Sequence, residues 1–274
     1  MPVIDAHVHV LPNFAPMDPW EDLGRVDRLL HHMDECEVDK AVVLPVVAEY
    51  SPGNNQECAQ WGREHPDRLA VLADVPMHQQ DAAERVLRAG EEFGAVGTSY
   101  YPPRLDERMQ WMLEEACDAL WQAYKDTGLV CNLQIGPANY GILLELAQKY
   151  PEIRFVANHL ALPGLAGGPD AQDETYGGLL QAAAYPNLSI KASGFYAAAA
   201  TAWDFRCPQA LGFFNCLLKG LGADRLLWGS DWPPVGRHIT YRQSLEIVRT
   251  FAAELDEGDR DKVLGENAAR VYGI

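Results

Sequence analysis

The sequence lacks several features that would assign it to a common class of protein. Its six cysteines are scattered and form no Cys-x-x-Cys pair, which excludes a zinc ribbon or a redox motif. Basic side chains are few, since 22 Lys and Arg stand against 39 Asp and Glu and leave a net charge of -17. This balance argues against nucleic acid or an anionic membrane as a partner. No apolar run approaches the ~20 residues of a membrane helix.

What is present fits an ordinary globular protein. The chain of 274 residues is 48% hydrophobic, enough for a large core without a disulfide scaffold. Its first residues, Met-Pro-Val-Ile-Asp, enter a strand-like run at once, so the sequence predicts no secretory signal. We therefore expect a cytoplasmic protein that acts on small molecules, and the sequence leaves a homodimer open.

Short apolar runs alternate eight times with longer amphipathic segments. Each run has strand length, is rich in Val, Ile, Leu and aromatic residues, and lacks the polar alternation of a half-exposed sheet. The runs are residues 3–10, 40–47, 69–75, 95–101, 129–135, 154–160, 188–194 and 225–232. Helical patterns lie between them, for example over 81–93, 108–126 and 142–150.

Strands that alternate with helices pair in parallel, so this pattern predicts an α/β fold, a single (β/α)₈ TIM barrel over residues 1–274. An open doubly wound sheet is the second candidate, but no glycine-rich phosphate loop follows an early strand. The glycine-rich segment 164–175 follows the sixth run, where we expect a mobile loop at the active-site face.

Polar side chains gather where three of these runs end, which is where a barrel places its functional residues. His7 and His9 lie two apart on the first strand and so share a face, with Asp5 deeper on the same side. His159 ends the sixth run and Asp231 ends the eighth. Each taken alone fits a structural role, but their joint placement predicts one cavity holding three histidines and an aspartate.

The motifs that carry these residues resemble the amidohydrolase superfamily. The opening Val-Ile-Asp-Ala-His-Val-His (3–9) is similar to its first-strand signature, and Gly-Ser-Asp-Trp-Pro (229–233) and Gly-Glu-Asn-Ala (265–268) are similar to its amidohydrolase-related subgroup. The segments GLVCNLQIGP (128–137), PEIRFVANHLALP (151–163), PNLSIKASG (186–194) and ADRLLWGSDWP (223–233) resemble the branch of sugar lactonases and 2-pyrone-4,6-dicarboxylate lactonases. The resemblance covers nearly the whole chain.

The sequence departs from the metal-dependent members of that superfamily at two strands. Gln134 stands about where those members place a histidine on strand five, and strand four offers neither an acid nor a lysine. A binuclear metal centre would therefore lack its bridging ligand. His7, His9 and Asp231 could still hold one divalent ion such as zinc, with water in its open positions.

The resemblance to the lactonase branch implies a mechanism that requires no metal. In it, Asp231 is the general base that takes a proton from water, while His7, His9 and His159 polarise the lactone carbonyl and stabilise the oxyanion. The substrate is then a small sugar lactone or carboxylated lactone. Two alternatives remain: a mononuclear metal-dependent decarboxylase or hydrolase of the same superfamily, and a binding or scaffold protein on a retained barrel.

Further residues are expected to line the rim of the cavity and bind substrate. Arginines there could grip a substrate carboxylate as a bidentate pair, although an ordinary surface arginine is an equally good interpretation. Aromatic rings could stack on a sugar or a planar ring. The candidates are Tyr100, Arg104, Gln134, Tyr196, Trp232, Arg237 and His238.

Overall fold

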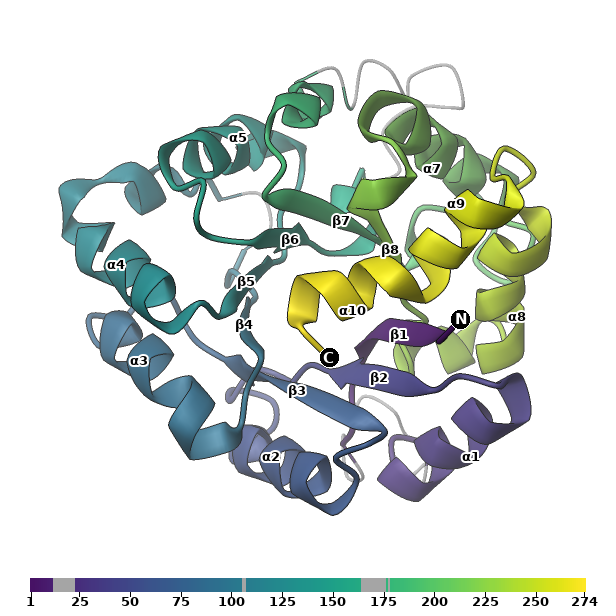
Figure 1. Ribbon diagram of the computed structural model, residues 1–274, viewed down its shortest axis with the longest axis horizontal. Helices are drawn as coiled ribbons and strands as arrows, with labels where there is room; N and C mark the ends of the chain where they lie inside the picture. The colour runs from purple at the N-terminus through teal and green to yellow at the C-terminus, as the bar shows by residue number, and fades with distance from the viewer. Residues whose placement is uncertain (12–22, 105–106, 164–175, 177) are drawn as a thin grey trace.

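The computed structural model describes residues 1–11, 23–104, 107–163, 176 and 178–274. Its centre is one sheet of eight parallel strands that neighbour one another in the order of the sequence (Figure 1). A parallel bridge between Val8 and Trp232 joins the first strand to the chain after the last one and closes the sheet. The predicted (β/α)₈ barrel is confirmed, and the open doubly wound sheet is excluded. Segment 164–175 lies outside the described residues.

Each strand lies inside one of the eight predicted apolar runs but is shorter than the run. The last residues of a run leave the ladder and enter the loop that follows, which is where the site residues lie. The strands are β1 (Ile4–Val8), β2 (Lys40–Val43), β3 (Leu69–Asp74), β4 (Gly97–Tyr100), β5 (Val130–Leu133), β6 (Phe155–Ala157), β7 (Leu188–Ala192) and β8 (Leu226–Trp228).

Helices surround the barrel, and most of them bury one apolar stripe. In α3, for example, Ala82, Val86 and Ala89 recur at helical spacing and are all buried. The helices are α1 (Val26–Cys36), α2 (Asn54–Glu64), α3 (Ala82–Phe93), α4 (Asp118–Thr127), α5 (Tyr140–Lys149), α7 (Pro208–Leu221), α8 (Tyr241–Glu246), α9 (Glu257–Asp261) and α10 (Asn267–Tyr272).

The helix expected over 108–126 is wrong in its first half. Two 3₁₀ turns, Gln110–Leu113 and Glu115–Cys117, precede α4, and Glu114 between them has an extended backbone. Side chains take polar backbone groups of this segment: the Met109 amide donates to Asn139 Oδ1, and Trp121 Nε1 of α4 donates to the Met112 carbonyl. These contacts replace the hydrogen bonds of a continuous helix.

The C-terminal helix α10 closes one end of the barrel. Its Ala268, Val271 and Tyr272 pack against inward-facing residues of the strands, and Figure 1 shows α10 lying across the barrel opening. Arg154, just before β6 begins, donates to the Val271 carbonyl, so this is the end where the strands start. The opposite end, where the strands finish, is left for the site.

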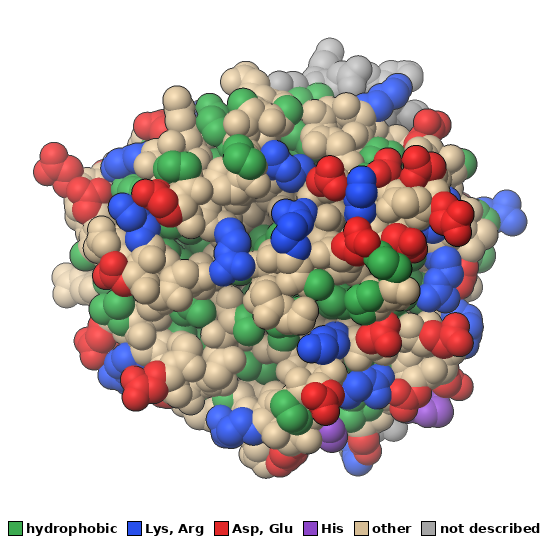
Figure 2. Space-filling view, viewed as in Figure 1, with side chains coloured by type: hydrophobic (Ala, Val, Ile, Leu, Met, Phe, Trp, Pro, Cys, Tyr) green, Lys and Arg blue, Asp and Glu red, His purple; other side chains and the backbone are tan. Residues whose placement is uncertain are grey.

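The outer surface carries the acidic excess. The acidic pairs 91–92, 114–115 and 256–257 are exposed, as solubility requires. Figure 2 shows acidic and basic side chains interspersed over the face that includes α10. Within the residues that the structure describes, no helix has the length and apolar character needed to cross a membrane.

Candidate active site

His7, His9 and Asp231 meet where β1 lies beside the chain after β8. The Asp231 amide donates to the His7 carbonyl over 2.9 Å, and the His9 amide donates to the Trp232 carbonyl over 2.7 Å. The two histidine Nε2 atoms are 3.3 Å apart, and Asp231 Oδ1 lies 3.6 Å from each. All three residues are buried. The predicted convergence of strands one and eight is therefore present in the structure.

Asp5 supports this arrangement from below. Its Oδ1 accepts the backbone amides of His7 and Ser230, over 3.1 and 2.8 Å. Burial raises the pKa of this carboxyl to about 6, although the hydrogen bonds from Ser230 act in the opposite direction. Because Asp5 binds the backbone just before both His7 and Asp231, it fixes the two functional side chains relative to each other.

His159 joins the cluster from an unusual turn after β6. Residues 159–162 all have positive φ, from 50° to 57°, a left-handed conformation that costs energy for residues other than glycine. The His159 Nδ1 lies 3.0 Å from Ser193 Oγ, and its ring centre lies 4.4 Å from that of His7. Strained backbone of this kind concentrates at functional sites, where the surrounding structure holds it in place.

Gly194 leaves the space that the His159 ring occupies. A Cβ at this position would lie 2.7 Å from His159 Nδ1, closer than such atoms approach one another. Gly128 has a similar positive φ, 65° against 61°, but nothing lies within 4 Å of its Cβ position.

We expect Gly194→Ala to lower kcat/KM roughly 10- to 100-fold, because it displaces a reacting-site imidazole. Gly128→Ala is the matched control: it carries a similar backbone cost, roughly 1–2 kcal/mol, without touching the site. Thermal unfolding and steady-state kinetics of both variants check this. Equal activity in the two would show that the position of His159 does not matter.

Tyr196 holds the outer oxygen of Asp231. Its hydroxyl donates to Asp231 Oδ2 over 2.5 Å, and its ring stacks on His238 at 4.6 Å. Burial by itself would raise the pKa of Asp231, but the nearby rings of His159 and His9 and the hydrogen bond from Tyr196 outweigh it and bring the pKa to about 2. Asp231 is therefore a carboxylate at neutral pH, with Oδ1 on the histidine side.

Lys191 is a site residue that the sequence interpretation missed. It lies on β7, is fully buried, and places Nζ 3.4 Å from His7 Nδ1 and 5.8 Å from the centre of the Tyr272 ring. Burial lowers its pKa well below the usual range, against the pull of Asp5 and Asp231. A lysine inside an apolar strand was the available signal, because unpaired lysines are almost never fully buried.

The hydrogen bonds of the two β1 histidines constrain their tautomers. A carbonyl oxygen only accepts, so His9 Nδ1, 2.8 Å from the Leu44 carbonyl, carries a hydrogen and leaves its Nε2 as an acceptor. His7 Nε2 faces that acceptor and so carries the hydrogen between them. His7 Nδ1 then accepts from Lys191. This chain of bonds places the one hydrogen of the His7 ring on Nε2, beside His9 Nε2 and Asp231 Oδ1.

The predicted rim residues separate into three groups. Tyr196 contacts Asp231. Gln134 directly follows β5, and the described residues supply no hydrogen-bond partner for its buried Oε1. Exposed positions after β4 and β8 are taken by Arg104, Arg237 and His238. Tyr100 and Trp232 are buried in the outer core beside other rings.

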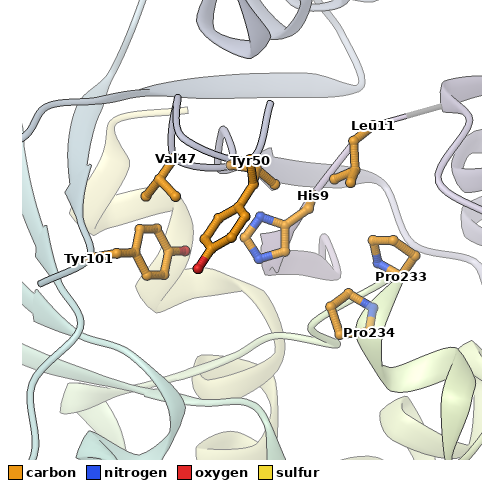
Figure 3. Close-up of a pocket in the computed structure, with 8 residues that line it drawn as sticks. His9, Leu11, Val47, Tyr50, Tyr101, Pro233 and Pro234 are labelled. Carbon is orange, nitrogen blue, oxygen red and sulfur yellow. The ribbon is translucent and has the colours of Figure 1, made fainter. Parts of the chain in front are cut away.

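Tyr101, directly after β4, is the tyrosine that faces the site. The Thr98 hydroxyl is hydrogen-bonded to Tyr124 of α4, so Thr98 and Tyr100 point outward and Tyr101 points inward. Tyr101 lines a pocket of about 230 Å³ beside His9, shown in Figure 3. The other lining residues are Leu11, Val46, Val47, Tyr50, Pro233 and Pro234.

His7, His9 and Asp231 also form a donor set suited to a single metal ion. One ligand atom of each lies within 4.8 Å of the others. Two imidazoles and a carboxylate are ligands that zinc accepts, and bond lengths of about 2.0–2.2 Å are compatible with the spacing of the three atoms. The donor set fits one divalent ion.

A closed barrel with histidines at the end of β1 and a buried carboxylate after β8 defines a catalytic-type site on an α/β barrel. Comparison with known proteins shows which family has it. The amidohydrolase family profile matches residues 4–274, so the chain belongs to the amidohydrolase family. The resemblance seen in the sequence motifs is confirmed.

Individual relatives agree with this assignment. An L-fucono-1,5-lactonase of Burkholderia ambifaria is 31% identical over 167 residues, which cover 60% of this chain and 55% of that protein. The chain thus aligns to about half the length of this relative. A zinc-bound amidohydrolase of Burkholderia multivorans has a TM-score of 0.80 at 20% identity, with both chains fully covered. A probable 2-pyrone-4,6-dicarboxylic acid hydrolase of Acinetobacter baumannii has 0.78, also at 20% identity and full coverage of both chains. The two solved structures share the barrel fold of this chain.

Proposed function

We propose that this chain hydrolyses a small lactone by direct attack of water on the ring ester. The observation that carries the proposal is the setting of Asp231, a buried carboxylate with one oxygen held by Tyr196 and the other facing two imidazoles. A carboxylate held in this way has one oxygen left to take a proton from water.

The reaction balances with these groups alone. Asp231 Oδ1 takes a proton from water as the water oxygen bonds to the lactone carbonyl carbon. When substrate binds, the Nε2–H of His7 donates to the carbonyl oxygen in place of His9 Nε2. Together with His159, it stabilises the negative charge on that oxygen. When the intermediate collapses, the ring C–O bond breaks and the alkoxide takes the proton back from Asp231. The product is an open hydroxy acid.

An ester of this kind is activated enough for hydrogen-bond donors to polarise it, whereas an unactivated amide would gain more from a metal. Asp231 is a weak base, so its fixed position and dry surroundings compensate for its low pKa. Tyr196 contributes by holding Oδ2, which keeps Oδ1 directed at the water.

A metal-dependent hydrolase or decarboxylase is the second candidate, favoured by the donor set of His7, His9 and Asp231. A divalent ion bound there would supply Lewis-acid polarisation of a carbonyl. The residues of the chain would keep their other tasks: Tyr196 would still orient Asp231, and Lys191 would still fix the ring of His7.

Chelation separates the two candidates. We expect the protein, freed of metal by a chelator and checked by elemental analysis, to keep most of its kcat/KM on a panel of lactones, because the polarising groups are side chains. A loss of activity that added zinc restores would instead establish the metal-dependent candidate. If no lactone in the panel is opened with or without metal, the proposed hydrolysis is wrong.

A further inference from the structure

The pocket beside His9 offers almost no charge to a substrate. Its walls are Leu11, Val46, Val47, Pro233 and Pro234, and its polar atoms belong to the His9 ring and the hydroxyls of Tyr50 and Tyr101. Among the residues that the structure describes, no Lys, Arg, Asp or Glu lines the pocket. Figure 3 shows the two tyrosine rings and the His9 ring around one space, with the valine and proline side chains beyond them.

The cations near the barrel mouth lie elsewhere. Arg104 and Arg237 are exposed and do not line this pocket, and Lys191 is buried under His7. Arg85 lines an adjoining pocket, where it forms an ion pair with Asp81 over 2.9 Å. The segments outside the described residues cannot add a cation, since 12–22, 105–106 and 164–175 contain no Lys or Arg in the sequence. Their charged residues are all acidic.

A carboxylate or sulfonate on the substrate would therefore bind weakly in this pocket. Such a group loses its bound water when it enters the pocket, and the walls offer neither a cation nor a set of hydrogen-bond donors to replace that water. The nearby carboxylate of Asp231 repels it further. An alkyl or aryl group meets the opposite situation, because each methylene it buries against apolar walls improves binding about fourfold.

One donor in the pocket is still unused. The Tyr101 hydroxyl is buried, and the described residues give it no hydrogen-bond partner. The Tyr101 ring centre lies 6.4 Å from that of His9, so its hydroxyl can reach a substrate that also contacts His9. A phenol donor suits a neutral oxygen, such as the ring oxygen of an ester.

We infer that the substrate is an uncharged lactone with a short alkyl or aryl substituent, which lies in this pocket while the ring ester faces His7 and Asp231. A volume of about 230 Å³ is below the usual range for drug-sized ligands, so a single ring with a short substituent fills it. The inference rests on the proposed lactone hydrolysis. The inferred substrate also differs from that of a relative whose name specifies a dicarboxylic acid.

A matched series of five-membered lactones tests the inference. γ-Valerolactone, γ-caprolactone and γ-heptalactone carry a methyl, ethyl and propyl group at one ring carbon, and 5-oxotetrahydrofuran-2-carboxylate carries a carboxylate there. We expect kcat/KM to rise about fourfold with each methylene until the pocket is full. We also expect the carboxylate to react at least tenfold more slowly than the methyl compound, about 1.4 kcal/mol.

The outcomes distinguish this inference from the proposed function. A carboxylate hydrolysed faster than γ-valerolactone overturns the inference while hydrolysis stands. Equal rates across the alkyl series also overturn it. Failure to open any member of the series contradicts the hydrolysis itself.

Variants of Val47 provide a second test. Val47→Arg places a cation in the wall and is expected to reverse the preference between carboxylate and methyl. Val47→Ala, which removes two methyl groups, is expected to lower kcat/KM for γ-heptalactone several-fold more than for γ-valerolactone. Leu87→Arg, at a 51% exposed position on α3, is the matched control and should leave both preferences unchanged. An unchanged preference in a folded Val47→Arg, or in Val47→Ala, places the substituent elsewhere.

Discussion

Replacement of Asp231 by asparagine is expected to lower kcat for lactone hydrolysis by at least about 100-fold, the usual loss when a general base is removed. Asparagine has nearly the same shape, and the backbone bond from the 231 amide to the His7 carbonyl stays in place. The amide has no basic oxygen with which to take a proton from water. The effect should therefore appear in kcat at saturating lactone, with the barrel intact by circular dichroism.

The control for this variant is Asp224→Asn, which makes the same chemical change at a carboxylate that is 68% exposed. We expect it to leave kcat unaltered. An Asp231→Asn enzyme with full kcat would remove Asp231 from the mechanism and return the alternatives to consideration. Tyr196→Phe should give a smaller loss, because Asp231 keeps its charge and loses only one hydrogen bond.

The fold was predictable because barrel strands are buried on both faces. Such strands appear in the sequence as short, nearly continuous apolar runs, and eight of them with helical patterns between leave few topologies. The cluster of His7, His9, His159 and Asp231 was predictable for a related reason. Polar residues that interrupt such runs at their ends must lie at one end of the barrel.

Features that depend on three-dimensional contacts were not predictable. The break in the expected helix over 108–126 accompanies tertiary hydrogen bonds such as the one from the Met109 amide to Asn139 Oδ1. The orientation of Tyr100 and Tyr101 depends on which face of β4 is inward, and two adjacent tyrosines give no pattern from which to decide. The left-handed turn that carries His159 contains no glycine.

Lys191 was missed for a different reason: a lysine within the apolar run of β7 signals an unusual buried residue, but the sequence does not show which side chain it contacts. Its function becomes visible only when Nζ is placed 3.4 Å from His7 Nδ1. Lys191 touches none of the positions proposed for the substrate. It is a positioning residue, since a bond to Nδ1 decides which nitrogen of His7 carries the hydrogen that faces the lactone.

Lys191→Met is accordingly expected to reduce kcat/KM roughly 10- to 100-fold, the range typical of residues that orient a functional histidine. Methionine is unbranched like lysine and extends to the same Cε position, with sulfur in place of Cδ and no terminal nitrogen. Because it fits an apolar interior beside Tyr272, we expect the melting temperature to hold or rise while activity falls. Lys219→Met, on the outer helix α7, is the control and should change neither quantity.

The ¹⁵N chemical shifts of the His7 ring give the readout that a purely structural role would leave unmoved. With Lys191 donating, Nδ1 should report a nitrogen without hydrogen and Nε2 one with hydrogen, and Lys191→Met should mix the two forms. Activity lost with unchanged ring shifts would mean that Lys191 supports the barrel interior and not the tautomer. Activity and shifts both unchanged would leave this buried lysine with no part in the reaction. Activity and stability are expected to change in opposite directions because burial of the Lys191 amine costs stability, whereas its bond to His7 orients the ring for the reaction.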